Sequence, residues 1–168
     1  MARGPVVRKS AEAVSPSGEK SLGGVDHVDT VAVNVAPGTT PAEFAKAMMS
    51  SPPTWVITLM SVRDKIVKPF GLRGGAVREP GEVRPGASLG PMRVIEVSDA
   101  EVLAGKDDKH LSYRVVFVVR DGAHGPEGAC STVVRYNRAS GKRYFTVIRP
   151  FHNTIMSSFA KRGGATLG

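Results

Sequence analysis

Residues 40–72 read TTPAEFAKAMMSSPPTWVITLMSVRDKIVKPFGL, and this stretch decides the fold class. Its apolar residues recur at helical spacing, so it predicts two consecutive amphipathic helices between one short strand and a run of later strands. A helix pair inside an otherwise β-rich chain indicates an α+β fold in which a curved antiparallel sheet holds helices against one face. Such a scaffold usually has a hollow interior, so the stretch also indicates where a site would lie.

Local signals mark where these two helices begin and end. Thr40-Pro41-Ala42-Glu43 is a capping box: the Thr40 hydroxyl can accept the amide of the third helical residue, and Glu43 can reach back to the Thr40 amide. Ser51-Pro52-Pro53 then ends the first helix and starts the second. The second helix is expected to stop near Gly71.

The strands are predicted from the alternation of apolar and polar residues. One strand, beginning at Asp29, precedes the helices. Residues 73–91 are rich in glycine and proline, so they predict a loop with at most one poor strand. Short connections then join four strands into an antiparallel meander: Met92–Ser98, Ala100–Gly105, Leu111–Arg120 and Ala129–Asn137.

The last segment has two interpretations. Arg143–Ile148 has strand propensity, but five apolar residues recur there at a spacing of three to four. We favour one long helix from Ser140 to about Arg162, with Pro150 as a tolerated kink. The five residues are Tyr144, Ile148, Phe151, Ile155 and Phe159.

The composition fits one domain behind an N-terminal arm. A chain of 168 residues with 41% apolar residues can build one sizeable core. Residues 1–24 mix glycine, serine, proline and charge without periodicity, which predicts a disordered basic arm whose removal costs little stability, followed by a single domain over 25–168. The chain has no secretory signal or membrane-length apolar run, and its single cysteine cannot form an internal disulfide, so we expect a cytoplasmic protein.

The chain is basic, with a net charge of +8 and no acidic residue after Glu127. Such asymmetry can mark a nucleic-acid or anionic-membrane surface, or simply a solvated basic helix. Nucleic-acid binding is disfavoured, because no nucleic-acid motif is present and aromatic residues are only 6%. No metal, nucleotide or nucleophile motif occurs either, so neither a metal nor a cofactor is predicted.

Polar residues in apolar surroundings are the candidates for a site. His110 directly precedes the strand 111–120 and shares one face with its Arg114, and an inward Arg114 needs an anion, either a ligand or a carboxylate such as Asp107 or Asp108. The alternative to ligand binding is a structural ion pair at the strand end, with His110 capping a turn.

Two further polar residues lie on the predicted helices. His152, on the C-terminal helix, would point toward the sheet or the cavity edge, where a neutral imidazole suits proton transfer; a hydrogen-bonded core histidine is the alternative. Arg63 could reach the cavity mouth or form a helix-surface salt bridge.

Trp55 is expected to be a buried core anchor or a cavity wall. The candidate ligand-binding residues are Arg114, His152, His110, Trp55, Arg63, Met60, Phe117 and Phe151.

Three segments carry a family resemblance. In order, they are PPTWVITLMSVRDKIVKPFGL, DDKHLSYRV and VIRPFHNTIM, and they fall within residues 26–162. On them the chain resembles a bacterial domain-of-unknown-function family, number 2867, within the START-like, birch-pollen-allergen-like (SRPBCC) superfamily. The resemblance implies a helix-grip fold, in which a curved sheet wraps round the C-terminal helix. It also implies a neighbour, since such domains are sometimes fused to short-chain-dehydrogenase-like Rossmann domains.

These observations leave three hypotheses for function. The first is a non-catalytic domain that binds a small apolar ligand in a START-like cavity. The second is an isomerase-like or cyclase-like enzyme on the same fold, with His152 or His110 as the base in a proton transfer and Arg114 as the oxyanion partner. The third is an interaction module that docks on a Rossmann-type reductase or an anionic surface, and it expects a filled interior.

Overall fold

An antiparallel sheet is the central element of this computed structural model, which describes residues 6–50, 52–71 and 79–168. Within those ranges the sheet has seven strands in the order β1-β2-β7-β6-β5-β4-β3. The strands are β1 (Arg8–Ser10), β2 (His27–Asn34), β3 (Ser88–Leu89), β4 (Met92–Val97), β5 (Glu101–Asp107), β6 (Leu111–Gly122) and β7 (Gly125–Tyr136). The helices are α1 (Ser17–Leu22), α2 (Pro41–Ser50), α3 (Thr54–Val67), the 3-10 helix η1 (Lys68–Phe70) and α4 (Ala139–Leu167). The predicted α+β architecture is therefore confirmed.

The predicted meander corresponds to β4 to β7, and β6 and β7 are longer than expected. Residues 121–128, predicted as a loop, lie largely in the β6–β7 hairpin, whose register continues to the pair Gly122 and Gly125. Gly125 has a φ of 107°, a conformation that L-residues with side chains rarely adopt, and it allows the tight reversal. In the predicted loop 73–91, β3 is the one short strand, while residues 72–78 lie outside the described residues.

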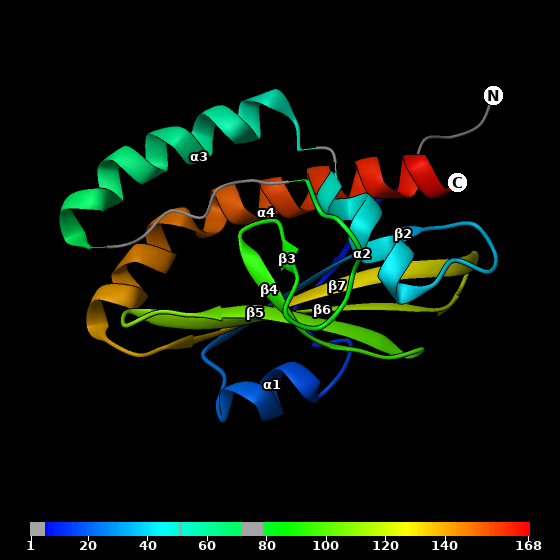
Figure 1. Cartoon of the computed structure of the whole chain (residues 1–168), viewed down its shortest axis with the longest axis horizontal. Coiled ribbons are helices and arrows are strands. Elements are labelled where there is room, and N and C mark those ends of the chain that lie inside the picture. Colours follow the sequence, from blue (N-terminus) through cyan, green and yellow to red (C-terminus); the bar gives the residue numbers. More distant parts are fainter. Residues whose placement is uncertain (1–5, 51, 72–78) are drawn as a thin grey trace.

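The two faces of the sheet have different partners. Helices α2, α3 and α4 lie on one side, which we call the inner face, and α1 lies on the other, the outer face (Figure 1). Because side chains alternate along a strand, β6 sends Val115 and Phe117 to the inner core and Val116 and Val118 to a separate outer cluster.

The predicted capping box begins α2. The Thr40 amide donates to Glu43 Oε2 at 2.8 Å, and the Glu43 amide donates to Thr40 Oγ1 at 3.2 Å. Two hydrogen bonds hold the pKa of Glu43 below its usual value: the one from the Thr40 backbone amide has the larger effect, and the one from the Thr40 hydroxyl adds to it. Phe44, one turn further, is fully buried and meets the ring of Phe117 edge-on with centroids 6.2 Å apart. The cap therefore sets the helix phase that fills the inner core.

The long C-terminal helix is confirmed, with Pro150 inside it. Two glycines near its end allow close packing. A Cβ on Gly164 would lie 2.6 Å from Val33 Cγ2, and one on Gly163 would lie 2.9 Å from Met48 Cα. The end of α4 is thus held against β2 and α2, while its first half continues over the open part of the inner face.

The prediction of a disordered N-terminal arm is wrong for the described part of that segment. Residues 8–10 form β1 at the sheet edge, and α1 covers the outer face. The Val14 amide donates to Ser131 Oγ at 2.9 Å, and Thr30 Oγ1 donates to the Glu12 carbonyl at 2.6 Å. Few apolar residues are needed in the segment, because β6 and β7 supply an apolar surface on which it lies.

Candidate functional site

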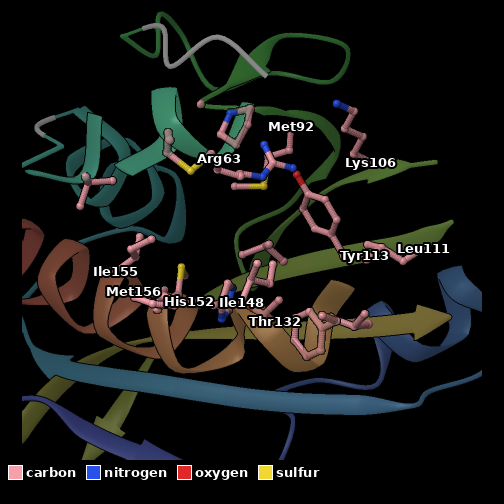
Figure 2. A pocket seen from close by; sticks show the side chains of 18 of the residues that line it. Arg63, Met92, Lys106, Leu111, Tyr113, Thr132, Ile148, His152, Ile155 and Met156 are labelled. Carbon is pink, nitrogen blue, oxygen red and sulfur yellow. The ribbon is translucent and has the colours of Figure 1, made fainter. Parts of the chain in front are cut away.

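A cavity of about 270 Å³ lies between the inner face of the sheet and the helices α3 and α4 (Figure 2). Its wall is mostly apolar. Helix α3 contributes Val56, Leu59, Met60 and Arg63; α4 contributes Tyr144, Phe145, Ile148, Phe151, His152, Ile155, Met156 and Phe159; the sheet contributes Met92, Lys106, Leu111, Tyr113, Val115, Thr132 and Val134. This is the hollow that the helix pair predicted.

Two polar atoms in the cavity wall are buried without a hydrogen-bond partner among the described residues. They are Oγ1 of Thr132, on β7, and Nδ1 of His152, on α4. Leaving a buried polar group unpaired costs about 1–3 kcal/mol. Because buried polar groups in proteins are almost always paired, the Thr132 hydroxyl is a natural contact for a polar group of a ligand, whereas Nδ1 of His152 faces the Asp29 carboxylate.

His152 belongs to a cluster of three titratable residues. Nε2 of His27 lies 3.1 Å from Oδ2 of Asp29, within hydrogen-bond distance, and Nδ1 of His152 lies 3.4 Å from the same oxygen. The second approach has the distance of an ion pair but is not aligned as a hydrogen bond. Burial acts to raise the pKa of Asp29, but the imidazoles of His152 and His27 outweigh it and keep that pKa below the usual aspartate value. Asp29 is therefore a carboxylate at neutral pH.

Arg63 lies in the cavity wall and is already partnered. Its Nε donates to the Tyr144 hydroxyl, its Nη1 pairs with Asp64 Oδ1 at 2.9 Å, and its guanidinium lies 5.6 Å from the Tyr144 ring centroid. The salt bridge predicted for Arg63 is therefore present, and the residue also lines the cavity. Nearby, burial raises the pKa of Tyr113 to about 12, so its phenol is protonated at neutral pH and can donate a hydrogen bond.

The structure places four of the eight predicted site residues in the cavity wall. These are Met60, Arg63, Phe151 and His152. Phe151 is still 53% exposed, so it lies where the cavity meets solvent. The other four residues lie elsewhere, each for a physical reason.

Arg114 and His110 lie outside the wall of this cavity. Arg114 lies under α1 on the outer face, where Nη1 pairs with Asp107 Oδ1 at 3.0 Å and Nε donates to Ser21 Oγ at 2.8 Å. The structural ion pair is thus the correct alternative. His110 Nδ1 lies 2.6 Å from Ser140 Oγ, and its carbonyl accepts the amides of Asn137 and Arg138, so it joins β6 to the start of α4.

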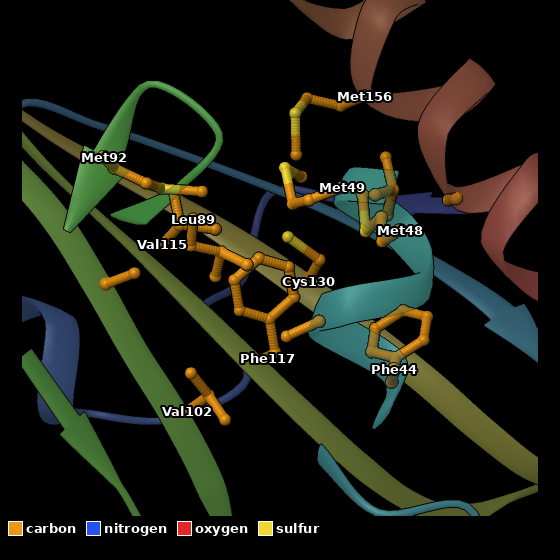
Figure 3. Packing of buried hydrophobic residues seen from close by; sticks show 14 of the residues in the cluster. Phe44, Met48, Met49, Leu89, Met92, Val102, Val115, Phe117, Cys130 and Met156 are labelled. Atoms are coloured by element: carbon orange, nitrogen blue, oxygen red, sulfur yellow. The ribbon is translucent and has the colours of Figure 1, made fainter. Parts of the chain in front are cut away.

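Phe117 and Trp55 do not line the cavity, for opposite reasons: Phe117 is too deeply buried and Trp55 is too exposed. Phe117 faces inward but is fully buried beneath α2, in the packed core seen in Figure 3. Trp55 is 44% exposed, since Val56 rather than Trp55 turns toward the cavity. The expectation of a buried Trp55 is wrong by part of a helical turn.

Asp29 and Thr132 were not among the predicted site residues. Their registers pair them directly across β2 and β7. A signal for them exists in the sequence, because Asp29 alternates with the inward Val31 and Val33, and Thr132 with the inward Cys130. A polar residue at such an alternate position faces the interior whatever its chemistry.

Comparison with known proteins places this chain in a family. A family model described as a protein of unknown function, DUF2867, matches residues 21–159. The chain belongs to the DUF2867 family. None of the curated proteins compared with the chain matches it.

One solved structure similar to this DUF2867 protein is the crystal structure of CalU16 from Micromonospora echinospora. The likeness covers 98% of this chain and 96% of CalU16, with 7% sequence identity and a TM-score of 0.35. The antiparallel sheet with a long C-terminal helix across its inner face is a helix-grip-like arrangement. No helix in the described ranges is long and apolar enough to cross a bilayer. Nor do the described residues bring together three His, Cys, Asp or Glu side chains able to hold a metal ion.

Proposed function

We propose that this protein binds a small apolar molecule carrying one polar group, in the cavity between the sheet and the helices α3 and α4. One observation carries the proposal: an apolar cavity whose wall holds the buried hydroxyl of Thr132, which has no hydrogen-bond partner among the described residues. Small-molecule sites are typically apolar hollows with a few well-placed polar groups. An interaction module expects a filled interior, so the cavity favours ligand binding over that alternative.

The size of the cavity limits the ligand. Its volume of about 270 Å³ is at the lower end of the roughly 300–1,000 Å³ usual for ligand pockets. A one- or two-ring compound or a short acyl chain fits this volume better than a two-chain lipid. A carbonyl suits the polar groups, because the hydroxyls of Thr132 and Tyr113 can both donate to an acceptor oxygen.

Entry is proposed to occur at α3. Of its fourteen residues, only Val56 and Val67 are buried, so this helix is lightly held compared with α2. Elements with few buried apolar residues open at the lowest free-energy cost. Phe151, half-exposed at the same margin, would line the path.

The binding test compares two ligands that differ by one oxygen. 1-Indanone and indane are rigid bicyclic molecules of nearly the same shape, and only 1-indanone has a carbonyl. Calorimetric titration should show both binding to the wild type, with 1-indanone tighter. Thr132→Val should weaken that preference by at least several-fold, because it deletes one of the two donor hydroxyls while keeping the shape. Thr58→Val, at a residue of α3 that bonds only its own helix, is the matched control.

A second pair of variants tests the location. Ile148→Trp should fill the cavity and abolish binding of both probes, whereas Ile57→Trp, on the exposed side of α3, should leave binding unchanged. Binding that survives Ile148→Trp in a folded protein, or no binding of either probe to the wild type, would reject the proposed site. Native mass spectrometry of the protein purified from its own host would then identify any natural ligand. Docking on a Rossmann-type reductase stays a prediction of the family resemblance.

A further inference from the structure

The cavity wall and the titratable cluster meet at one place, where α4 passes over β2 and β7. Asp29 on β2 and Thr132 on β7 are register partners, and His152 of α4 lies against both the Asp29 carboxylate and the cavity. Figure 2 labels both His152 and Thr132 among the side chains that line the cavity. The Asp29 side chain is only 16% exposed, so the charge next to His152 is poorly screened by solvent.

From this juxtaposition we propose that His152 is a general base at the cavity. Asp29 would position its ring, and Thr132 would hydrogen-bond the substrate oxygen on which charge develops. The substrate class is a small apolar carbonyl compound with an acidic C–H next to the carbonyl. This inference rests on the proposed binding function, which supplies the bound molecule.

The orientation of His152 fits a base. Its Nδ1 faces Asp29, so an Nδ1–H directed at the carboxylate leaves the lone pair on Nε2, the nitrogen available to a molecule in the cavity. A carboxylate behind an imidazole fixes its tautomer and stabilises the cation that forms when it takes a proton. The separation of 3.4 Å is long for a hydrogen bond, but such contacts commonly tighten only when substrate is bound.

A purely structural role for His152 explains less. Asp29 already has His27 as a hydrogen-bonded partner at 3.1 Å, so His152 is not required to satisfy that oxygen. The ring of Phe145 contacts both imidazoles, with its centroid 5.0 Å from that of His27 and 6.1 Å from that of His152. The two histidines differ in their hydrogen bonding, because His27 is paired with Asp29 whereas Nδ1 of His152 has no aligned hydrogen bond and its ring lines the cavity.

The proposed step is balanced without a co-reactant. Nε2 of His152 removes a proton from the carbon next to the carbonyl, the C–H electron pair becomes the π bond between the two carbons, and the carbonyl π pair moves onto oxygen to give an enolate. The Thr132 hydroxyl donates to the enolate oxygen. The imidazolium then returns the proton to the same carbon or, in a conjugated substrate, to a more distant carbon, which shifts the double bond. No oxidant or reductant takes part.

The test uses 5-nitrobenzisoxazole, a small apolar bicyclic probe with one acidic C–H. A base removes that proton, the ring N–O bond breaks, and the coloured 2-cyano-4-nitrophenolate carries away the negative charge. The wild type should accelerate this reaction above the buffer rate, with saturation by the probe and competition by 1-indanone. The rate should fall at acid pH, where the imidazole is protonated.

Variants assign the roles. His152→Gln should lose about 100-fold in kcat, within the usual range for general-base catalysis, while its affinity for 1-indanone remains. His124→Gln, on the exposed β6–β7 turn, should match the wild type. Asp29→Asn should lower kcat with KM and the affinity for 1-indanone little changed, since the imidazolium formed in the reaction loses its counter-charge. A merely structural Asp29 would leave kcat of the folded variant unchanged.

The outcomes separate the two proposals. Probe binding with no rate above buffer, or a rate unchanged in folded His152→Gln, would overturn the catalytic inference and leave the binding proposal standing. If His152→Gln does not fold, the wild-type profile decides, because a rate that does not fall at acid pH excludes an imidazole base. Failure of both the probe and 1-indanone to bind would overturn the binding proposal and the inference together.

Discussion

Thr30 and Thr132 lie on neighbouring strands and are equally buried at 3% exposure, but they differ in the hydrogen bonding of their hydroxyls. Thr30 Oγ1, on the outer face, bonds the Glu12 carbonyl and Ser131 Oγ, whereas Thr132 Oγ1, on the inner face, has no partner among the described residues. Replacing both partners of a hydrogen bond by apolar groups can leave the stability of the protein unchanged, but leaving one buried polar group unpaired lowers it. The two threonines therefore provide an internal comparison.

Threonine-to-valine substitution should have opposite effects at the two positions. In the ligand-free protein, Thr132→Val should leave the free energy of unfolding unchanged or raise it by up to about 1 kcal/mol, since it removes an unpaired hydroxyl. Thr30→Val should lower it by about 1–3 kcal/mol, because two hydrogen bonds are lost and the buried Ser131 hydroxyl loses one of its partners. Urea titration of both variants measures this. Equal losses would mean that Thr132 is satisfied within the folded protein.

The Asp29 cluster predicts a defined pH dependence of stability. The pKa of Asp29 lies below its usual 3.8, so the carboxylate stabilises the fold at pH values above about 4, and that stabilisation is lost as the pH falls through the lowered value. Asp29→Asn should cost roughly 1.5–3 kcal/mol at pH 7, the usual range for a hydrogen bond to a charged group. The difference from the wild type should shrink below about pH 4. Urea titrations at pH 7 and pH 3 compare the two, and a difference independent of pH would contradict the assignment.

Two aromatic truncations test the phase of the helices. Trp55→Ala should change the free energy of unfolding by less than about 1 kcal/mol, because the side chain is 44% exposed and outside the cavity. Phe44→Ala should cost about 3–5 kcal/mol, because Phe44 is fully buried against Phe117. Chemical denaturation measures both. A large loss in Trp55→Ala would mean that α3 is rotated from the position described.

The sequence was most informative where a local signal decides a local structure. The capping box predicted the start of α2, and the three- to four-residue spacing of apolar side chains predicted α4 through Pro150. The helix pair also predicted the cavity. In each case, hydrogen bonds or periodicity within one segment contain the information needed.

The sequence was least informative where two segments pack on opposite faces of the same strand. Residues 115–119 of β6 are apolar at every position, so alternation does not reveal which face meets α4 and which meets α1. Arg114 was therefore assigned to the interior of the cavity rather than to the outer face. The choice depends on where the N-terminal segment lies, which composition alone does not show.

Arg114→Met tests the outer-face ion pair. The substitution keeps the packing of the stem but removes the hydrogen bonds to Ser21 and Asp107. The Asp107 side chain is 69% exposed, so it is not left as a buried charge, and the loss should be about 1–3 kcal/mol rather than the larger cost of breaking a buried pair. Affinity for 1-indanone should be unchanged. Weaker binding in a folded Arg114→Met protein would return Arg114 to the list of ligand contacts.

Removal of residues 1–24 is the strongest test of the N-terminal segment. Within it, Leu22 is buried, and Gly18 lies so close to the sheet that an added Cβ would be 3.0 Å from Val133 Cγ2. Deletion would expose the outer cluster around Val116 and Val118 to water. We therefore expect the melting temperature to fall by well over 5 °C, more than roughly 1 kcal/mol for a domain of this size.

A point variant distinguishes packing of the segment from a general effect of truncation. Gly18→Leu should push α1 off the outer face and reproduce much of the loss, because its side chain has no space between Val116 and Val133. Gly24→Ala is the control, since its nearest neighbour is 3.9 Å away. If the deletion and Gly18→Leu both melt like the wild type, the segment does not contribute to the fold. The outer face must then tolerate water, despite the valines that β6 and β7 place there.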